Sequence, residues 1–335
     1  MDPISQGVIG AVAAVSLAKN RESVRLAGVT GWIGGILADA DIVIRSASDP
    51  LLAIEYHRHF THSLLFIPIG GLLAAAFCWA LFRGRRSYRD CALFGVAGYA
   101  TSGLLDACTS YGTQLWWPFS SERVAWNIIS IVDPIFTITL VILFIVAVIR
   151  RSRTCARWAA GFALAYLALG VVQNTRASRV QAGIIAQRGH AGADMATVKP
   201  SIGNLVLWRS IYRHEGTFHV DAVRVGLTGS ERTYVGTSVP ALDADALKRD
   251  LPPASTLAND LDRFDHFSSR YLAHHPDQPE VLGDFRYAML PNSAVPLWGI
   301  RYDPAQPDHH VRFESFRSVR KEQRHELFRM ILGKD

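Results

Sequence analysis

Six apolar segments separated by short basic loops constrain this chain more than any other feature. The segments run approximately over Ile4 to Ala18, Val24 to Ala38, Ser63 to Phe82, Cys91 to Cys108, Ile128 to Ile149 and Trp158 to Val172. An α-helix rises about 1.5 Å per residue, so the third and fifth segments are long enough to cross a hydrocarbon core of about 30 Å. The first two are shorter and, taken alone, would indicate buried or interfacial helices. Because only 19% of the residues are charged and the mean hydropathy is +0.14, we predict an α-helical polytopic membrane domain with about six membrane segments.

Basic residues are concentrated in the loops that follow the first, third and fifth apolar segments. They are Lys19, Arg21, Arg25, Arg83, Arg85, Arg86, Arg89, Arg150, Arg151, Arg153 and Arg157. The positive-inside rule places these three loops in the cytoplasm, and the alternation holds only if all six segments cross. We therefore predict a multi-pass membrane protein, with the N-terminus and the C-terminal domain on the outer face of the membrane. The same clustering argues against a nucleic-acid partner, despite the formal net charge of +6.

A polar, strand-rich region follows the last apolar segment. Runs such as "TFHVDAVRV" and "PLWGIRY" are typical of β-strands and are separated by glycine, proline and asparagine. We predict a transmembrane helical domain over residues 1–175, a helical connector over 176–196, and a mixed, strand-rich α+β extracytoplasmic soluble domain over 197–335. The four cysteines have no CxxC spacing, so they indicate neither a zinc knuckle nor a disulfide framework.

Acids and imidazoles gather at the predicted outer ends of three different segments. Asp39 and Asp41 follow the second segment, His57 and His62 precede or open the third, and Asp106 lies near the end of the fourth. Ionisable groups at such positions are costly unless they are paired, hydrated or bound to a metal. Carboxylate oxygen and imidazole nitrogen together suit Zn²⁺, Mn²⁺ or Fe²⁺, and a metal with an open position activates water near neutral pH. These residues are therefore our candidates for a metal-binding and catalytic site.

The spacing of these residues leaves alternatives open. Asp39 and Asp41 do not share a helical face, so they reach one ion only if the helix has ended; otherwise they are polar loop residues. In a continuous helix, His57 and His62 would diverge by about 140°. Metal binding thus requires the chain to turn before Thr61, with a helix N-cap at Thr61 or a near neighbour. Without such a turn, the histidines are hydrogen-bonded interfacial residues.

Several neighbouring residues are secondary candidates. Glu55 is a candidate general base, and His59 would share a helical face with it in a continuous helix. Arg58 is interpreted either as binding a lipid phosphate or as snorkelling to the interface. Each of these interpretations depends on which way the side chain points, and the sequence does not fix that direction.

Two further candidates lie in the fourth and fifth segments. Ser102 stands one helical turn before Asp106, so it is either its hydrogen-bonding partner or a packing residue. Asp133 lies inside the predicted fifth segment, directly before a proline. It either supports the site or satisfies the backbone of a kinked helix.

Taken together, the strings "DAD", "HRHFTHS" and "LLDACTSYGTQLWWPFSSERVAWNIISIVDPIF" resemble the membrane-bound metal-dependent hydrolase family, also called YdjM-like. The C-terminal half resembles the outer domain of its longer proteobacterial members. The resemblance implies that the polar residues of the site are Asp39, Asp41, His57, His62 and Asp106. The family pattern tolerates other residues at the position of His59. The family pattern commonly has a histidine where this chain has Ser102. That difference implies weaker metal binding, a different metal or a non-catalytic member.

We therefore expect a membrane-bound metal-dependent hydrolase that uses Zn²⁺, with Mn²⁺ or Fe²⁺ as alternatives. The resemblance implies a multi-pass protein of the bacterial inner membrane, with the N-terminus and the C-terminal domain on the periplasmic side. The membrane level of the site indicates a lipid-like substrate, an ester or phosphoester, and the lipid bilayer as partner. The alternative is a non-catalytic inner-membrane envelope protein with a partner-binding outer domain. A transporter is disfavoured, because the polar residues gather at one face and not at the bilayer midplane. The sequence names neither the substrate nor a protein partner.

Overall fold

The chain forms two compact units in the computed structural model, which describes residues 1–82, 87–318 and 320–334. The first, here called the membrane unit, contains Met1–Val43, Tyr56–Val172 and Ile202–Asn204. The second, here called the sheet unit, contains Ile44–Glu55, Gln173–Ser201 and the described residues from 205 onward. Of the basic residues used to predict the topology, Arg83, Arg85 and Arg86 lie outside the described residues.

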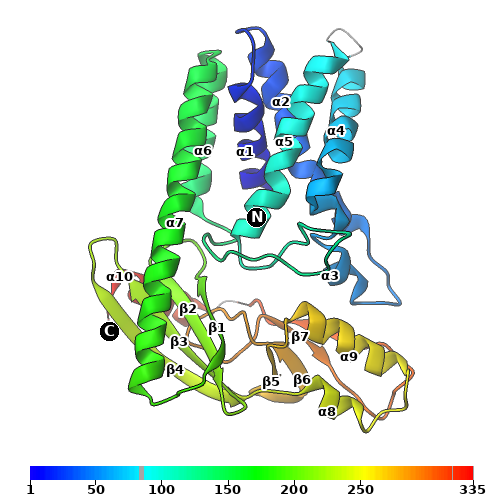
Figure 1. Ribbon diagram of the computed structural model, residues 1–335, viewed down its shortest axis with the longest axis vertical. Helices are drawn as coiled ribbons and strands as arrows, with labels where there is room; N and C mark the ends of the chain where they lie inside the picture. The colour runs from blue at the N-terminus through cyan, green and yellow to red at the C-terminus, as the bar shows by residue number, and fades with distance from the viewer. Residues whose placement is uncertain (83–86, 319, 335) are drawn as a thin grey trace. The chain divides into compact units, whose positions relative to one another are not determined.

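Each predicted apolar segment contributes one α-helix to the membrane unit (Figure 1). The helices are α1 (Pro3–Ser16), α2 (Ser23–Leu37), α4 (Ile67–Leu81), α5 (Tyr88–Cys108), α6 (Pro134–Ile149) and α7 (Arg153–Gln187), whose last residues belong to the sheet unit. Shorter elements between α2 and α4 are η1 (Ala38–Val43), α3 (Leu52–Tyr56), η2 (Phe60–His62) and η3 (Leu64–Phe66). Four stretches of the described chain are long and apolar enough to span a membrane, namely Ser23–Val43, Leu64–Leu81, Tyr88–Cys108 and Arg153–Gln187. Because α1 and α6 are shorter apolar helices, the structure supports four of the six predicted crossings.

Small residues set the distance between α1, α2 and α5. A Cβ added at Gly10 would lie 2.5 Å from the backbone oxygen of Gly31, and one added at Gly34 would lie 2.6 Å from that of Gly95. Membrane helices approach closely where glycines face each other, because no side chain separates the backbones. This contact brings the end of α2 beside the end of α5.

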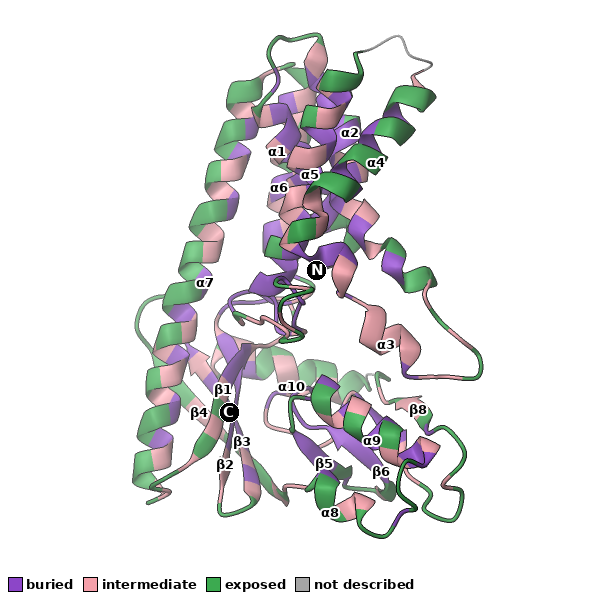
Figure 2. Cartoon of the chain, turned by 45° about the vertical axis from the view of Figure 1, so that its right-hand side comes forward, coloured by how far each residue is buried: buried purple, intermediate pink, exposed green. Residues whose placement is uncertain are grey.

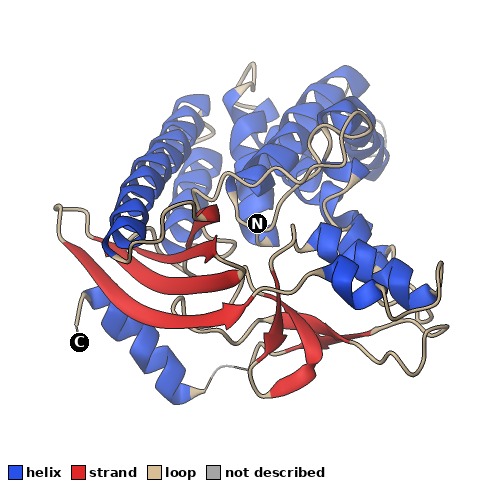
Figure 3. Cartoon of the chain, turned by 60° about the horizontal axis from the view of Figure 1, so that its bottom comes forward, coloured by secondary structure: helices blue, strands red, loops and turns tan. Residues whose placement is uncertain are grey.

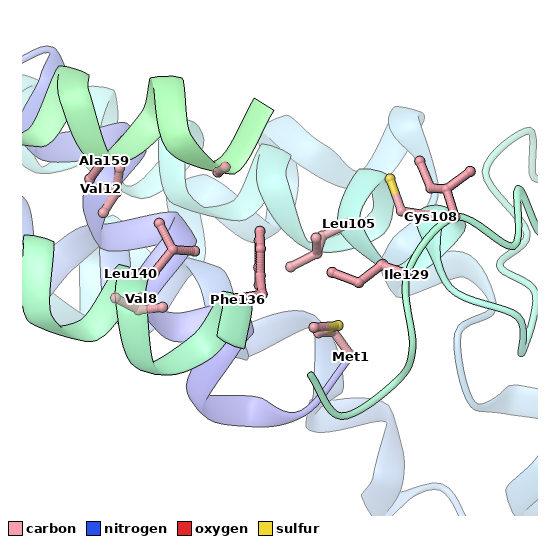
Figure 4. Close-up of a cluster of buried hydrophobic side chains, with 11 residues drawn as sticks. Met1, Val8, Val12, Leu105, Cys108, Ile129, Phe136, Leu140 and Ala159 are labelled. Carbon is pink, nitrogen blue, oxygen red and sulfur yellow. The ribbon is translucent and has the colours of Figure 1, made fainter. Parts of the chain in front are cut away.

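The remaining helix faces of the bundle are apolar, both those that point into its interior and those on its outside. A core between α1, α5 and α6 contains the buried side chains of Val8, Leu105 and Phe136 (Figure 4). On the outside, α4 exposes Phe77 and α6 exposes Ile138, each at close to 60%. Figure 2 shows that α4 carries exposed residues along its length. Exposed apolar faces of this kind are suited to contact with lipid tails.

Helix α6 begins six residues later than the sequence predicted. The predicted segment started at Ile128, but the helix starts at Pro134 and Asp133 is its N-cap. The Asp133 carboxylate accepts a hydrogen bond from the backbone amide of Phe136 at 3.1 Å. An N-cap aspartate followed by proline at the first helical position is a strong start signal, because proline has no amide hydrogen to leave unsatisfied. The prediction that Asp133 lies within the helix is therefore wrong.

The sheet unit contains two four-stranded antiparallel sheets in which each strand pairs with its neighbours in sequence (Figure 3). The strands are β1 (Asp194–Pro200), β2 (Leu207–His214), β3 (Thr217–Val225), β4 (Glu231–Pro240), β5 (Leu272–His275), β6 (Gln278–Asp284), β7 (Trp298–Arg301) and β8 (Arg312–Ser315). Its further helices are α8 (Ala244–Lys248), α9 (Thr256–Phe267) and α10 (Lys321–Leu332). Buried aromatic rings of Phe218, Tyr271 and Phe285 form part of the core.

The last part of α7 packs against the first sheet. Ala177 and Ile184 are buried among Trp208 and other residues of β1, β2 and β3. The Gln181 side chain donates hydrogen bonds to backbone oxygens of β1 and β2, which fixes the helix against the strands. The helical connector that we expected to extend to residue 196 ends at Gln187, because β1 already begins at residue 194.

Candidate metal centre

The carboxylates that the sequence singles out lie where two helices of the membrane unit end. Helix α2 ends at Leu37, and the chain tightens into the 3-10 helix η1, which carries Asp39 and Asp41. Asp106 lies in the last turn of α5, which packs along α2. In this tighter helix Asp39 and Asp41 still point in different directions, and they reach His62 and His57 respectively. Both therefore contact the segment before α4.

The chain also turns between the two histidines of that segment. Arg58 has a left-handed backbone with φ of 60°, and η2 and η3 interrupt the path to α4. Ser63 is the N-cap of η3 and accepts a hydrogen bond from the amide three residues later at 3.3 Å. Helix α4 itself has Phe66 as its N-cap, without a side-chain hydrogen bond, so the cap on Ser63 belongs to η3 and the N-cap expected for the membrane helix at Thr61 or a near neighbour is not found there. This turn removes the divergence of His57 and His62 that a continuous helix would impose.

His62 is the centre of the polar cluster. Its Nε2 lies 3.2 Å from Asp39 Oδ1 and 3.1 Å from Asp106 Oδ2. Its Nδ1 lies 3.2 Å from Asp41 Oδ2 and 3.0 Å from the Thr61 hydroxyl. The His62 residue is 2% exposed and Asp106 is fully buried. A histidine whose one nitrogen faces carboxylates and whose other nitrogen is held by a carboxylate has the arrangement typical of a metal ligand.

Asp41 connects the two histidines through its two oxygens. Oδ1 lies 3.0 Å from His57 Nδ1, whereas Oδ2 accepts hydrogen bonds from the Arg58 amide at 2.8 Å and from Thr61 at 3.0 Å. The left-handed backbone at Arg58 costs about 1 to 2 kcal/mol for a residue with a side chain. The bond to Asp41 contributes to holding this turn in place.

Two overlapping sets of side chains could each hold a metal ion. One consists of Asp39, His62 and Asp106, and the other of Asp39, Asp41 and His57. In each set, one ligand atom from every residue lies within 4.8 Å of the others. The mixture of carboxylate oxygen and neutral imidazole nitrogen suits Zn²⁺, Mn²⁺ or Fe²⁺. The donor set therefore fits a divalent metal.

Arg58 balances the most deeply buried carboxylate. Its guanidinium lies 3.1 Å from Asp106 Oδ1 and donates to the Thr109 hydroxyl at 2.8 Å. The Gln6 amide donates to the other oxygen of Asp106 at 2.8 Å, and the amine of Met1 also contacts this carboxylate. A buried carboxylate needs such compensation, because its desolvation is otherwise very unfavourable.

The carboxylates also change the protonation of His62. Burial by itself would lower the pKa of His62, but hydrogen bonds to the three carboxylates raise this pKa to about 10. The protonated imidazole cannot bind a metal through the nitrogen that carries the proton. Metal binding at His62 therefore competes with this proton and must displace it.

Arg58 differs from its sequence-based interpretation, and its role was missed. It is 3% exposed and pairs with Asp106, so it neither snorkels nor lies at the surface. The signal was present in the sequence, since a buried aspartate requires a cation and an arginine stands between two candidate histidines. What the sequence does not show is the left-handed turn that directs the guanidinium inward.

The secondary candidates Glu55 and His59 are absent from both sets. The Glu55 carboxylate belongs to the sheet unit, where it accepts a hydrogen bond from Arg263 at 2.7 Å. The His59 ring lies 5.2 Å from Tyr56 and 5.8 Å from Trp117, measured between ring centroids, so it packs among aromatic rings.

Ser102 and Asp133 stabilise helices. The Ser102 hydroxyl is buried and donates to the backbone oxygen of Gly35, which joins α5 to α2. Asp133 caps α6 and accepts a hydrogen bond from the Tyr166 hydroxyl at 2.8 Å. Neither residue is part of the two sets of candidate ligands.

Comparison with known proteins places this arrangement in a family. A family model described as YdjM inner membrane protein matches residues 1–177, more than half of the chain and all five candidate ligands. The chain belongs to the YdjM inner membrane protein family. It is therefore a multi-pass inner membrane protein whose apolar helices contact the lipid bilayer.

A curated relative supports this family assignment. The inner membrane protein YbcI of Escherichia coli (strain K12) is 34% identical to this YdjM family member over 109 residues. The match covers 30% of this chain and 60% of YbcI, so the chain spans about three fifths of the length of that relative. No solved structure matches the chain.

Proposed function

We propose that this YdjM family member is a membrane-bound metal-dependent hydrolase. The observation that carries the proposal is the placement of His62, with Nε2 facing two carboxylates and Nδ1 held by Asp41. A metal-ligating histidine almost always has its second ring nitrogen held by a carboxylate, a backbone carbonyl or water, as Asp41 holds Nδ1 here. Zn²⁺ is the first candidate, with Mn²⁺ and Fe²⁺ as alternatives.

The residues of the chain divide into a buried and an accessible part. His62 and Asp106 are buried and would fix the metal, whereas the side chains of Asp39 and His57 are 22% and 30% exposed. When bound, the metal would lower the pKa of a coordinated water and polarise the bond to be cleaved. Water and substrate would approach from the side of His57, and an aspartate not needed as a ligand would accept the proton from water.

The site lies at the ends of apolar helices, which supports a substrate drawn from the lipid bilayer. An ester or phosphoester of a lipid fits a metal-activated water. Following the positive-inside rule, we place the site, the N-terminus and the sheet unit on the periplasmic face.

Metal analysis of the purified full-length protein tests the proposal. We expect a stoichiometric divalent transition metal, lost in His62→Ala and retained in His59→Ala, which alters the same segment outside both sets. Absence of bound metal in the wild type after incubation with Zn²⁺, Mn²⁺ and Fe²⁺ would refute the metal-dependent hydrolase.

A non-catalytic envelope protein is the second candidate, and Ser102 favours it. The family pattern commonly has a histidine at this position, whereas the Ser102 hydroxyl here joins α5 to α2 through Gly35. In that case the polar cluster is an internal ion-pair network between His62, Arg58 and the carboxylates, and the sheet unit binds a partner. The same metal analysis separates the two functions.

A further inference from the structure

The candidate ligands form two sets that share one residue, Asp39. We propose that the centre holds two divalent ions bridged by the Asp39 carboxylate, with His62 and Asp106 on one ion and Asp41 and His57 on the other. The proposal rests on the proposed metal-dependent function and extends it to the substrate, a phosphoester. Three observations support it: the directions in which the His62 nitrogens point, an unpaired buried amide oxygen beside the carboxylates, and the net charge of the centre.

The directions of the His62 nitrogens separate the two sets. The two nitrogens of an imidazole ring point away from each other, so an ion bound to Nε2 lies on the side of Asp39 and Asp106. Asp41 lies on the other side of the ring, against Nδ1. The remaining oxygen of Asp41 faces His57 at 3.0 Å. Asp41 and His57 thus form a second donor pair that the first ion does not use.

Asp39 can serve both ions. It is the one member of both sets, and its side chain is 22% exposed, so it is not enclosed by other partners. Two ligand atoms at about 2.0 to 2.2 Å from one ion lie at most about 4.4 Å apart. The ligand atoms of each set lie within 4.8 Å of one another, so each set closes around an ion with a small adjustment. A carboxylate has two oxygens and can bind one ion with each.

The Gln6 amide gives an independent indication of a missing cation. Gln6 is fully buried, and within the described part of the chain its Oε1 has no hydrogen-bond partner. Its Nε2 lies 2.8 Å from Asp106 Oδ2 and 3.5 Å from Asp39 Oδ1, so this amide is directed at the shared carboxylates. Buried amide oxygens are rarely left unpaired, and turning the amide by 180° would direct Oε1 at an ion, or at its bound water, beside Asp39 and Asp106.

The charge of the centre indicates the class of substrate. The three carboxylates and Arg58 leave two negative charges, which one divalent ion balances. A second divalent ion gives the centre a net positive charge, which favours an anionic phosphoester over a neutral carboxylic ester. Paired ions about 3.5 to 4 Å apart are typical of enzymes that cleave phosphoesters. In that reaction, the water oxygen bonds to phosphorus, the bond from phosphorus to the alcohol oxygen breaks, and a proton from the water ends on the alcohol.

The number of ions tests the proposal without measuring activity. The full-length protein, purified in detergent and loaded with Mn²⁺, should bind two ions per chain by elemental analysis and give a spin-coupled signal in electron paramagnetic resonance. In His57→Ala we expect one bound ion and no spin-coupled signal. In Asp39→Asn we expect both ions to bind more weakly. His59→Ala should retain two coupled ions. Asp41→Asn provides a second variant of the same ion set if His57→Ala does not fold.

The outcomes distinguish this proposal from the function on which it rests. One ion in the wild type that is retained in His57→Ala and lost in His62→Ala overturns the second ion and leaves a single-metal hydrolase, in which His57 and Asp41 form an acid–base pair. One ion that is lost in both variants indicates a single mixed site and also overturns the proposal. No bound ion in the wild type overturns both.

Inorganic phosphate tests the substrate class. Binding to the Mn²⁺-loaded protein can be followed by paramagnetic broadening of the phosphorus resonance. We expect phosphate to bind the wild type and to bind His57→Ala at least about tenfold more weakly, since one ion fewer attracts it. A protein that holds two ions but does not bind phosphate would contradict the phosphoester assignment.

Discussion

Arg58 is the residue on which the buried carboxylate depends. Its guanidinium lies 3.1 Å from Asp106 Oδ1, and both side chains are buried. Removing one member of a buried ion pair costs about 3 to 5 kcal/mol, because the other charge is left uncompensated. We expect Arg58→Gln to lower the thermal stability of the purified protein strongly, and Arg58→Lys to lower it less.

A double-mutant cycle distinguishes this pairing from general packing. If the ion pair is responsible, Arg58→Gln combined with Asp106→Asn should be less destabilised than the sum of the two single variants. Additive effects would show that Arg58 does not stabilise the protein through Asp106. The comparison requires metal-free protein, because Asp106 is also a candidate ligand.

Lys199 gives the sheet unit a dependence on pH. Burial, followed by the nearby Arg286 charge, lowers the pKa of Lys199 to about 7. Between pH 7 and the ordinary lysine pKa near 10.5, the unfolded chain binds the proton and the folded chain does not. Stability should therefore rise with pH across this interval. Thermal unfolding as a function of pH should show the rise in wild type and a flatter curve, with higher stability at pH 7, in Lys199→Met.

The exposed Lys321 on α10 is the matched control for this measurement. Lys321→Met should leave the slope between pH 7 and 10 unchanged. An equal slope in wild type and Lys199→Met would assign the pH dependence to another group.

Among the elements, α2 determines whether the carboxylates that follow it lie beside the carboxylate at the end of α5. A Cβ added at Gly31 would lie 2.5 Å from the Gly10 backbone oxygen on α1. Gly31→Val should separate α1 from α2 at a cost of about 1 to 3 kcal/mol and displace Asp39, so that both thermal stability and bound metal decrease. Gly161→Val on α7 is the control, because a Cβ there has no neighbour within 4 Å. Retained metal in Gly31→Val would show that the α1 contact does not position the site.

The sequence predicted the existence of the helices better than their ends. The apolar run before Ile149 predicted a helix from Ile128, since apolarity alone does not distinguish a helix from an apolar loop. The start depends on Asp133 as N-cap, whose effect outweighs the apolar residues before it. The turn at Arg58 was required by the metal hypothesis, but its left-handed geometry follows from tertiary contacts with Asp41 and Asp106. Contacts of this kind between distant segments are not visible in local patterns.

At the scale of the whole molecule, the sheet unit holds the segment that joins two parts of the candidate site. Residues 44–55 follow Asp41 and precede His57, yet they belong to the sheet unit. Arg263 on α9 binds Asp49 at 3.0 Å and Glu55 at 2.7 Å and anchors this segment at two points. Released from Arg263, the segment should be more accessible to protease.

Limited trypsin digestion measures this anchoring. We expect Arg263→Ala to accelerate cleavage after the exposed Arg45, because the segment loses its ion pairs. Arg301→Ala is the control, since Arg301 pairs with Glu280 and Glu314 in the same unit and not with this segment. Equal cleavage rates in the three proteins would mean that Arg263 does not restrain the segment.

The number of crossings decides on which side of the membrane the sheet unit lies. If α1 and α6 cross together with the four longer spans, the positive-inside rule places the residues after α7 in the periplasm and the loop at Arg151 in the cytoplasm. If α6 does not cross, both positions are reversed. We expect α6 to cross, because only then does the Arg150 to Arg157 cluster lie on the same side as the other basic loops. A reporter that is active only outside the cytoplasm should therefore function when fused after Arg176 and fail when fused after Arg151. The opposite pair of results would establish that α6 remains on one side, and the sheet unit would then be cytoplasmic.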